Sequence, residues 1–312
     1  HGFRGDQANG AHIVDGVDTT TGLGILSLHG KNKKPSPESL SDVSVIVFDI
    51  QDVGARFYTY LSTLILVMEA SAENDIQVIV LDRPNPHGHH VRGPMLDPKF
   101  SSFVGLAPVP VVHGMTLGEI ALMANGEGWL EGGIRADLKV ISCDGYKHSN
   151  EYSLPIAPSP NLPSDQSIAL YPSLCFLEPT AISIGRGTPT PFEIIGYPGN
   201  KNGDFHFTPV STPGASPNPK HKDQMCFGQN LNNINTTWDL SILFNYADHF
   251  RNDQGELEGF FISENFFDKL AGTDQLRIAL EKGSSLEDAE ATWEEDLEKF
   301  KIARAPYLLY PK

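Results

Sequence analysis

Two short apolar runs that flank a helical pattern constrain the fold of this chain more than any other feature. Residues 43–48 (VSVIVF) and 76–81 (IQVIVL) are rich in β-branched side chains, and an aspartate follows each run. Between the runs, apolar side chains recur at the spacing of one helix face: Phe57, Leu61, Leu64, Ile65, Met68 and Ala72. A strand, a helix and a second strand in this order predict a βαβ unit of a buried parallel sheet, with a right-handed crossover.

Polar side chains follow both predicted strands. Six of them stand where the strands end: Asp49, Gln51, Asp52, Asp82, Arg83 and Asn85. Ligands of open parallel sheets bind beyond the carboxyl ends of the strands, so we expect Asp49 and Asp82 to face a common cleft. An aspartate at such a position is also a common helix cap or loop anchor, and this pattern alone does not establish catalysis.

The rest of the chain predicts further helices and a change of domain. Thr116 and Glu119 have the spacing of a capping box, which predicts a helix from Thr116, and residues 136–142 predict another strand. Prolines then punctuate an extended segment over residues 155–163. We therefore expect an α/β parallel-sheet domain over residues 1–160 and a smaller α/β domain over residues 161–312.

The second domain is expected to end in helices. Helical patterns cover residues 239–251, 264–271 and 287–303. The last of these has an apolar face made of four side chains: Trp293, Leu297, Phe300 and Ile302.

Charge and missing motifs exclude several classes of function. The chain has 23 basic and 39 acidic residues and a net charge of −16, which disfavours a nucleic-acid partner. No apolar run approaches the roughly 18 residues of a membrane span. Neither G-x-G-x-x-G nor a P-loop motif is present, so no nucleotide cofactor is expected. The histidines of residues 87–90 (HGHH) lack an i,i+4 helical pair and an associated acid, so no metal site is expected there.

Several short motifs occur in a fixed order along the chain. They are FDIQDVGARFYTY (48–60), LDRPNP (81–86), RGP (92–94), SFVG (102–105), HGMT (113–116), PSPN (158–161), GRGT (185–188) and PFE (191–193). In this order they resemble the NamZ-type exo-β-N-acetylmuramidases, a glycosidase family first catalogued as a domain of unknown function. The opening residues 1–5 (HGFRG) and the closing residues 301–310 resemble that family too, so the resemblance covers almost the whole chain.

The resemblance implies a fold, an activity and a location. It implies a Rossmann-like N-terminal domain, a smaller α/β C-terminal domain and a cleft between them. The implied activity is release of non-reducing-end N-acetylmuramic acid (MurNAc) from peptidoglycan fragments, which are muropeptides or MurNAc-GlcNAc, without a cofactor. A periplasmic or secreted location follows, with a signal peptide upstream of His1.

Glycoside hydrolysis usually needs two carboxyl groups, one as the acid and one as the base or nucleophile. Within the family-like motifs, the candidates for catalysis are Asp49, Asp52 and Glu178. In the family, a glutamate directly before the HGFRG-like segment is a leading candidate. We therefore expect that glutamate, with a strand and a helix that precede it, upstream of His1.

Substrate contacts are expected from a larger set of side chains in the same motifs: His1, Arg4, Arg56, Tyr58, Tyr60, Asp82, Arg83, His113, Asn161, Arg186 and Glu193. The lactyl carboxylate of MurNAc calls for an arginine fork, for which we consider Arg56 and Arg186. Tyr58 and Tyr60 could stack on a sugar or donate a hydrogen bond, or one could pack in the core.

Two further expectations concern the cleft. His113 and Asn161 are expected to line the same cleft as Asp52 and Arg56, with a local helix cap as the alternative for His113. This chain also has Pro179, Ala181 and Ile184 where the family commonly has Gly, Asn and Glu, which indicates a less polar lining and a different substrate preference.

Two other readings compete with an enzyme of this family. The first is a non-catalytic cell-wall glycan-binding protein of the same fold. The second is a nucleotide- or cofactor-dependent α/β enzyme, which the absence of phosphate-binding motifs disfavours.

Overall fold

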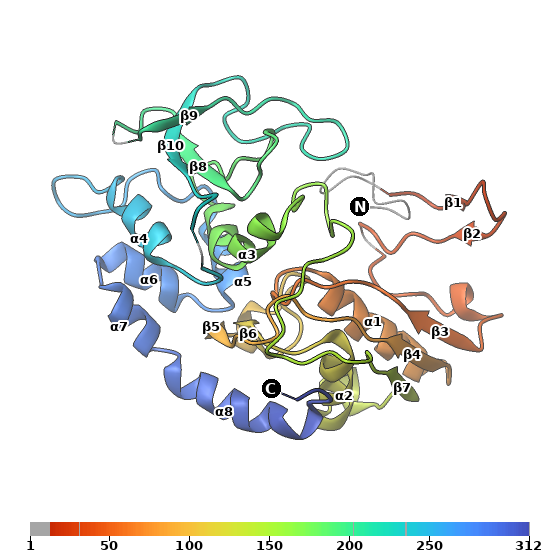
Figure 1. Cartoon of the computed structure of the whole chain (residues 1–312). Helices are drawn as coiled ribbons and strands as arrows, with labels where there is room; N and C mark the ends of the chain where they lie inside the picture. Colours follow the sequence, from red (N-terminus) through yellow and green to blue (C-terminus); the bar gives the residue numbers. More distant parts are fainter. Residues whose placement is uncertain (1–12, 31, 202, 235, 312) are drawn as a thin grey trace.

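The predicted βαβ unit is present in the computed structural model, which describes residues 13–30, 32–201, 203–234 and 236–311. Strand β3 (Val45–Phe48), helix α1 (Tyr60–Glu73) and strand β4 (Gln77–Leu81) follow one another, and the two strands pair in parallel. Strand β7 (Leu138–Ile141) pairs in parallel with the other edge of β4, so that the sheet has the order β3-β4-β7 (Figure 1). Helix α2 (Leu117–Glu127) packs against α1, β4 and β7.

One face of this sheet is buried and the other is partly exposed. Val78 and Val80 of β4 are buried at 0% and 1% exposure, together with Leu61 of α1. On the opposite face, Val45 and Val47 of β3 are 42% and 55% exposed. The prediction of a strand buried on both faces is therefore wrong for β3, because α1 and α2 cover only one side among the described residues.

Asp82, directly after β4, anchors helix α2. Its Oδ2 accepts hydrogen bonds from Thr116 Oγ1 and from Tyr310 Oη, each at 2.6 Å, and its Oδ1 accepts one from Gly118 N at 2.8 Å. The predicted capping box between Thr116 and Glu119 is confirmed. Asp82 therefore takes the role of a helix anchor, and the prediction that it faces a cleft with Asp49 is wrong.

The second half of the chain begins with α3 (Asp165–Leu174) and continues into a small antiparallel sheet of order β8-β10-β9. Its strands are β8 (Ile194–Tyr197), β9 (Phe205–Phe207) and β10 (Cys226–Asn230). Five helices then follow: α4 (Ser241–Asp248), α5 (Glu264–Ala271), α6 (Gln275–Lys282), α7 (Leu286–Ala291) and α8 (Glu294–Arg304). Two antiparallel pairs complete the strands: β1 (Gly16–Val17) with β2 (Gly24–Ile25), and β5 (Arg92–Met95) with β6 (Pro110–Val112).

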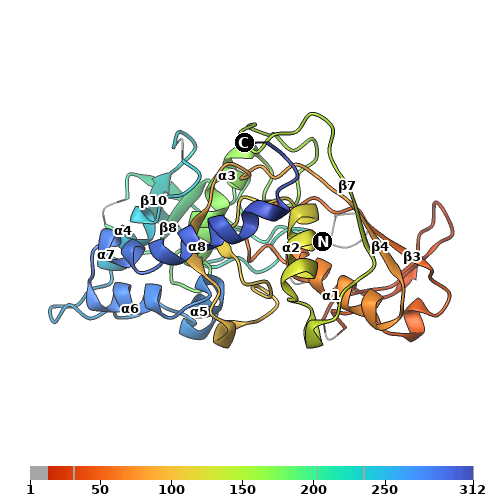
Figure 2. The same cartoon turned by 90° about the horizontal axis from the view of Figure 1, so that it is seen from below.

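The three predicted C-terminal helices are present, but α6 was not predicted and the last predicted helix is broken. The helix predicted over residues 287–303 is divided into α7 and α8, with Trp293 between them. Ile302 is 75% exposed while the other three predicted apolar side chains are buried, because it follows Phe300 by two positions, about 200° around the same helix. Helix α8 leads into a 3-10 helix (Ala305–Tyr307) that contacts α2, and the view from below shows α8 and α2 close together (Figure 2). No helix in the described ranges is long and apolar enough to span a membrane.

Arg56 joins the two halves of the chain through the core. Its side chain is fully buried, and its guanidinium donates to the carbonyl oxygens of Pro94 (2.9 Å) and Val109 (2.8 Å). It also donates to the carbonyls of Leu270 (3.0 Å) and Ala271 (2.7 Å), at the end of α5. The prediction that Arg56 contacts substrate is wrong, because the side chain is fully buried and its guanidinium donates to four backbone carbonyls.

Candidate functional site

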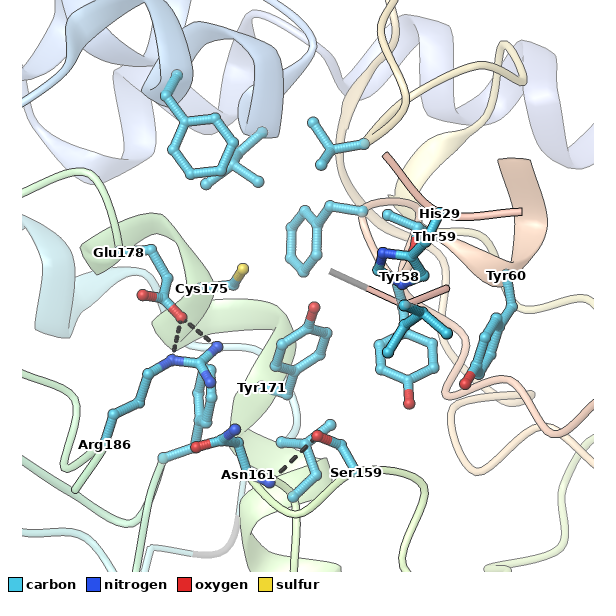
Figure 3. Close-up of a pocket in the computed structure, with 17 residues that line it drawn as sticks. His29, Tyr58, Thr59, Tyr60, Ser159, Asn161, Tyr171, Cys175, Glu178 and Arg186 are labelled. Carbon is cyan, nitrogen blue, oxygen red and sulfur yellow. Dashed lines mark hydrogen bonds and ion pairs between the residues drawn. The ribbon is translucent and has the colours of Figure 1, made fainter. Parts of the chain in front are cut away.

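A pocket of about 280 Å3 lies where the two halves of the chain meet. One wall comes from the segment that leads into α1, with Tyr58 and Tyr60. The facing wall comes from the region after α3, with Glu178 and Arg186 (Figure 3). Asn161, from the extended segment before α3, closes the pocket between them. The structure thus brings together five of the side chains that the motifs singled out.

Aromatic rings form the floor of this pocket. Tyr171 of α3 packs edge-on against Phe57, with ring centroids 5.3 Å apart, and against Phe192 at 5.1 Å. Phe192 has φ 63°, a left-handed backbone that is strained for an aromatic residue and that is typical of functional sites. Sequence reasoning missed Tyr171 and passed over Phe192, because it looked for polar groups in the PFE motif.

Glu178 and Arg186 face the pocket as an ion pair. Arg186 Nη2 and Nε lie 2.5 and 2.7 Å from Glu178 Oε1. The arginine also lies over the Phe192 ring, 5.1 Å from its centroid. Both side chains are partly accessible, at 18% for Arg186 and 22% for Glu178. Both contacts use the same carboxylate oxygen. Glu178 Oε2 and Arg186 Nη1 therefore remain without a hydrogen bond to another described residue.

Tyr58 and Tyr60 both lie at the pocket rather than in the core. Their rings are in edge-to-face contact with centroids 5.2 Å apart, and Tyr58 Oη donates to the Pro158 carbonyl at 2.8 Å. The backbone N–H of Asn161 donates a hydrogen bond to Ser159 Oγ (3.1 Å). The PSPN motif therefore meets the FYTY motif across the pocket.

Asp52 and His113 form a second buried pair close to this wall. Asp52 Oδ2 accepts from Gly54 N at 2.7 Å and lies 3.8 Å from His113 Nε2. Burial raises the pKa of Asp52 to about 7. Burial, helped by the charge of Arg304, lowers the pKa of His113 to about 3, so the imidazole is neutral. Among the described residues, Asp52 Oδ1 and His113 Nε2 have no hydrogen-bond partner.

The relation of this pair to the pocket corrects one prediction. His113 is fully buried, and its Nδ1 accepts the backbone N–H of Met115 at 3.2 Å, a local contact just before α2. Asn161 lines the pocket while His113 and Asp52 do not, so a single cleft containing all of them is not observed. The pKa of Tyr60 in the pocket wall is raised, mainly by burial of the tyrosine and also by the charge of the nearby Asp52.

Other predicted site residues have structural or surface positions. Asp49 and Arg83 form an ion pair at the surface, with Arg83 Nη2 2.6 Å from Asp49 Oδ1. Glu193 is buried, accepts a hydrogen bond from the Ser164 hydroxyl that caps α3, and does not line the pocket. The prediction that Glu193 contacts substrate is therefore wrong. His1 and Arg4 lie outside the described residues.

The described residues contain no group of three or more His, Cys, Asp or Glu side chains that could hold a metal ion. In the HGHH motif, His87 is buried and its Nδ1 lies 2.6 Å from the Val53 carbonyl. The site chemistry is thus that of carboxyl, guanidinium and phenol groups around an aromatic floor.

Comparisons with known proteins identify the family of this chain. The family model for the N-terminal part of the exo-β-N-acetylmuramidase NamZ matches residues 1–166, and the model for its C-terminal part matches residues 169–310. The peptidoglycan β-N-acetylmuramidase NamZ of Bacillus subtilis (strain 168) is 40% identical over 331 aligned positions. The alignment covers 99% of this chain and 78% of that protein.

Two crystal structures of DUF1343 family proteins from Bacteroides fragilis are similar to this fold. The first has a TM-score of 0.88 and 46% identity, and the match covers 95% of this chain and 82% of that one. The second has a TM-score of 0.82 and 29% identity, over 94% of this chain and 82% of that one. The two family models together cover nearly the whole sequence, and the chain therefore belongs to the NamZ exo-β-N-acetylmuramidase family.

Proposed function

We propose that this protein is an exo-acting glycoside hydrolase that releases MurNAc from the non-reducing ends of peptidoglycan fragments. Its family supports this activity, because the Bacillus subtilis relative is named as a peptidoglycan β-N-acetylmuramidase. The observation that carries the proposal is the pocket between the two halves of the chain. There, an arginine–carboxylate pair faces two tyrosines over an aromatic floor, which suits a sugar that bears a carboxylate.

Arg186 is the proposed partner of the lactyl carboxylate. Of the two arginines considered from the sequence, it is the one that lines the pocket, whereas Arg56 donates to backbone carbonyls. Its Nη1 is not used by another described residue, and Glu178 and Phe192 fix the plane of the guanidinium. A guanidinium fixed in this way can bind a carboxylate with little further ordering.

Asp52 and Glu178 are the proposed carboxyl groups of the reaction within the described chain. With a pKa of about 7, Asp52 can carry a proton near neutral pH. It lies behind the pocket wall and does not line the pocket, so it would act as the general acid through one bridging water. Glu178 is paired with an arginine and presents a carboxylate, the form that a base or a nucleophile requires.

The domain assignment and location are part of the same proposal. The parallel sheet with α1 and α2 supports a Rossmann-like domain over residues 1–160, followed by an α/β domain over residues 161–312. A peptidoglycan substrate supports a periplasmic or secreted enzyme that acts on muropeptides or MurNAc-GlcNAc.

The test of function is turnover of chromogenic glycosides by the full-length protein. We expect hydrolysis of the MurNAc glycoside and much slower hydrolysis of the GlcNAc glycoside, because only MurNAc carries the lactyl group. Saturable binding of the MurNAc glycoside without turnover would instead identify a glycan-binding protein.

Replacing Arg186 by alanine tests the recognition role. Loss of a charge-assisted hydrogen bond costs about 1.5–3 kcal/mol, so kcat/KM for the MurNAc glycoside should fall by roughly ten- to a hundredfold. The GlcNAc glycoside should be nearly unaffected. The control is Arg83→Ala, which removes an exposed arginine that is likewise paired with an acid. Equal losses on both glycosides would show that Arg186 serves only to hold Glu178.

A further inference from the structure

A second pocket, of about 390 Å3, lies between the loop after β4 and the end of α8, and it shares no lining residue with the first. Its polar wall consists of basic and imidazole side chains: His89, His90, Arg92, His148, Lys301 and Arg304. None of the described residues that line it is acidic, although the chain carries a net charge of −16. A pocket lined by one sign of charge concentrates counter-ions of the opposite sign.

His148 supplies a buried polar atom without a partner in this wall. The residue is 4% exposed, and its Nε2 lies 2.9 Å from Glu119 Oε1. Its Nδ1 has no hydrogen-bond partner among the described residues. A Cβ atom added to Gly88 would lie 3.2 Å from this nitrogen, and Gly88 itself lines the pocket. His148 thus presents a buried ring nitrogen to the pocket, while its other nitrogen is held by Glu119.

Arg304 supplies a second unused donor, and its position is fixed. Its Nη1 donates to the carbonyls of His113 (3.0 Å) and Gly114 (2.5 Å), which ties the end of α8 to the turn before α2. Its Nε is buried and unpaired within the described part of the chain. A guanidinium that is already ordered loses little entropy when it binds an anion.

Two further cations stand on different elements around the same space. Arg92 is exposed at the start of β5 and makes no ion pair with a described residue. Lys301 of α8 pairs at 2.5 Å with Glu298, which does not line the pocket. Burial and the positive charges of His89, His87 and Arg92 lower the pKa of His90 to about 4. The described lining therefore contains two arginines and a lysine and no carboxylate.

We propose that this pocket is a phosphate-binding site, in which Arg92, Lys301 and Arg304 hold the oxygens of a phosphate group beside His148. Arg92 lies on β5, Lys301 and Arg304 lie on α8, and His148 lies in the loop after β7, so the lining surrounds an anion from several directions. A tetrahedral dianion has enough oxygens to meet them together, whereas a carboxylate offers two coplanar oxygens. The site does not depend on the hydrolase activity.

Isothermal titration of the protein with inorganic phosphate tests the site. We expect saturable binding of one phosphate per chain, weakened by about tenfold or more in the double variant Arg92→Gln, Lys301→Gln, because two charge-assisted contacts are lost. Arg304 is left in place because it holds the backbone before α2. The control Lys299→Gln removes an exposed lysine of the same helix that does not line the pocket, and it should bind phosphate as the wild type does.

Titrations with other ligands show whether the site prefers phosphate to a carboxylate, and whether the phosphate is free or part of an ester. Acetate should bind at least about tenfold more weakly than phosphate, because it offers fewer oxygens. If a sugar phosphate binds more tightly than inorganic phosphate, the ligand of the site is a phosphate ester. If inorganic phosphate binds more tightly, the ligand is the free ion. The proposal is overturned if phosphate does not saturate the protein, if the double variant binds it as the wild type does, or if acetate binds equally well. Arg186→Ala should leave phosphate binding intact, so failure of the proposed hydrolase would not remove this result.

Discussion

Replacing Asp52 by asparagine should lower kcat for the MurNAc glycoside by about 10²–10⁴, the range typical for the loss of a general acid. Asparagine has nearly the same shape and can still accept the hydrogen bond from Gly54 N, but it carries no transferable proton. For the wild type, kcat should fall as pH rises through about 7, where Asp52 loses its proton. Steady-state kinetics between pH 5 and 9 check both expectations.

The same substitution should affect stability in the opposite direction. Burial raises the pKa of Asp52 from 3.8 to about 7, so between these values the folded state binds a proton that the unfolded state has lost. The stability that neutral Asp52 contributes is complete below pH 3.8 and is lost as pH rises to about 7. Above that pH, Asp52→Asn should therefore be the more stable protein by a few kcal/mol, at ~1.4 kcal/mol per pKa unit.

Urea denaturation at pH 4 and pH 8 measures this difference. At pH 4 the wild type and Asp52→Asn should have nearly equal free energies of unfolding. At pH 8 the variant should have the larger free energy of unfolding. The matched control is Asp49→Asn in the same motif, which removes one partner of an exposed ion pair and should change the free energy of unfolding by at most about 1 kcal/mol. If Asp52→Asn keeps the wild-type kcat, Asp52 has no part in the mechanism.

Replacing Arg56 by methionine should destabilise the protein by about 3–5 kcal/mol, the cost typical of breaking a buried charged network. Methionine fills much of the same volume, but four buried carbonyls of two distant segments lose their donor. Lysine should restore only part of the stability, because an ammonium cannot reproduce the planar fork.

Chemical denaturation monitored by tryptophan fluorescence tests this role. The control is Arg135→Met, an exposed arginine whose substitution should fall within about 0.5 kcal/mol of the wild type. A loss of less than about 1 kcal/mol in Arg56→Met would contradict the account of Arg56 as the link between the two halves.

Local patterns were sufficient for the elements with clear boundaries. Helix α5 has the predicted bounds, because Ser263 caps its start and Gly272 adopts the left-handed conformation at its end. The strands β3 and β4 and the capping box at Thr116 follow equally from neighbouring residues. The break between α7 and α8 was not predicted, since the apolar pattern runs through it.

The roles of the polar residues depended on contacts that no local pattern contains. Asp82 binds Tyr310 and Arg56 binds Leu270, and in both pairs the partners lie in opposite halves of the chain. Both residues stand in family-like motifs beside others that line the pocket, such as Tyr58. The motifs therefore located the site, but only the tertiary contacts separated its structural residues from those that can meet a ligand.

The central claim is exo-acting release of MurNAc, and the products of glycan digestion test it most directly. Oligosaccharides of alternating MurNAc and GlcNAc, with MurNAc at the non-reducing end, would be digested with the full-length protein and sampled over time by mass spectrometry. The account predicts that free MurNAc and the oligosaccharide shortened by one residue are the first products. Internal fragments as the first products, or release of GlcNAc from chains that begin with GlcNAc, would contradict it.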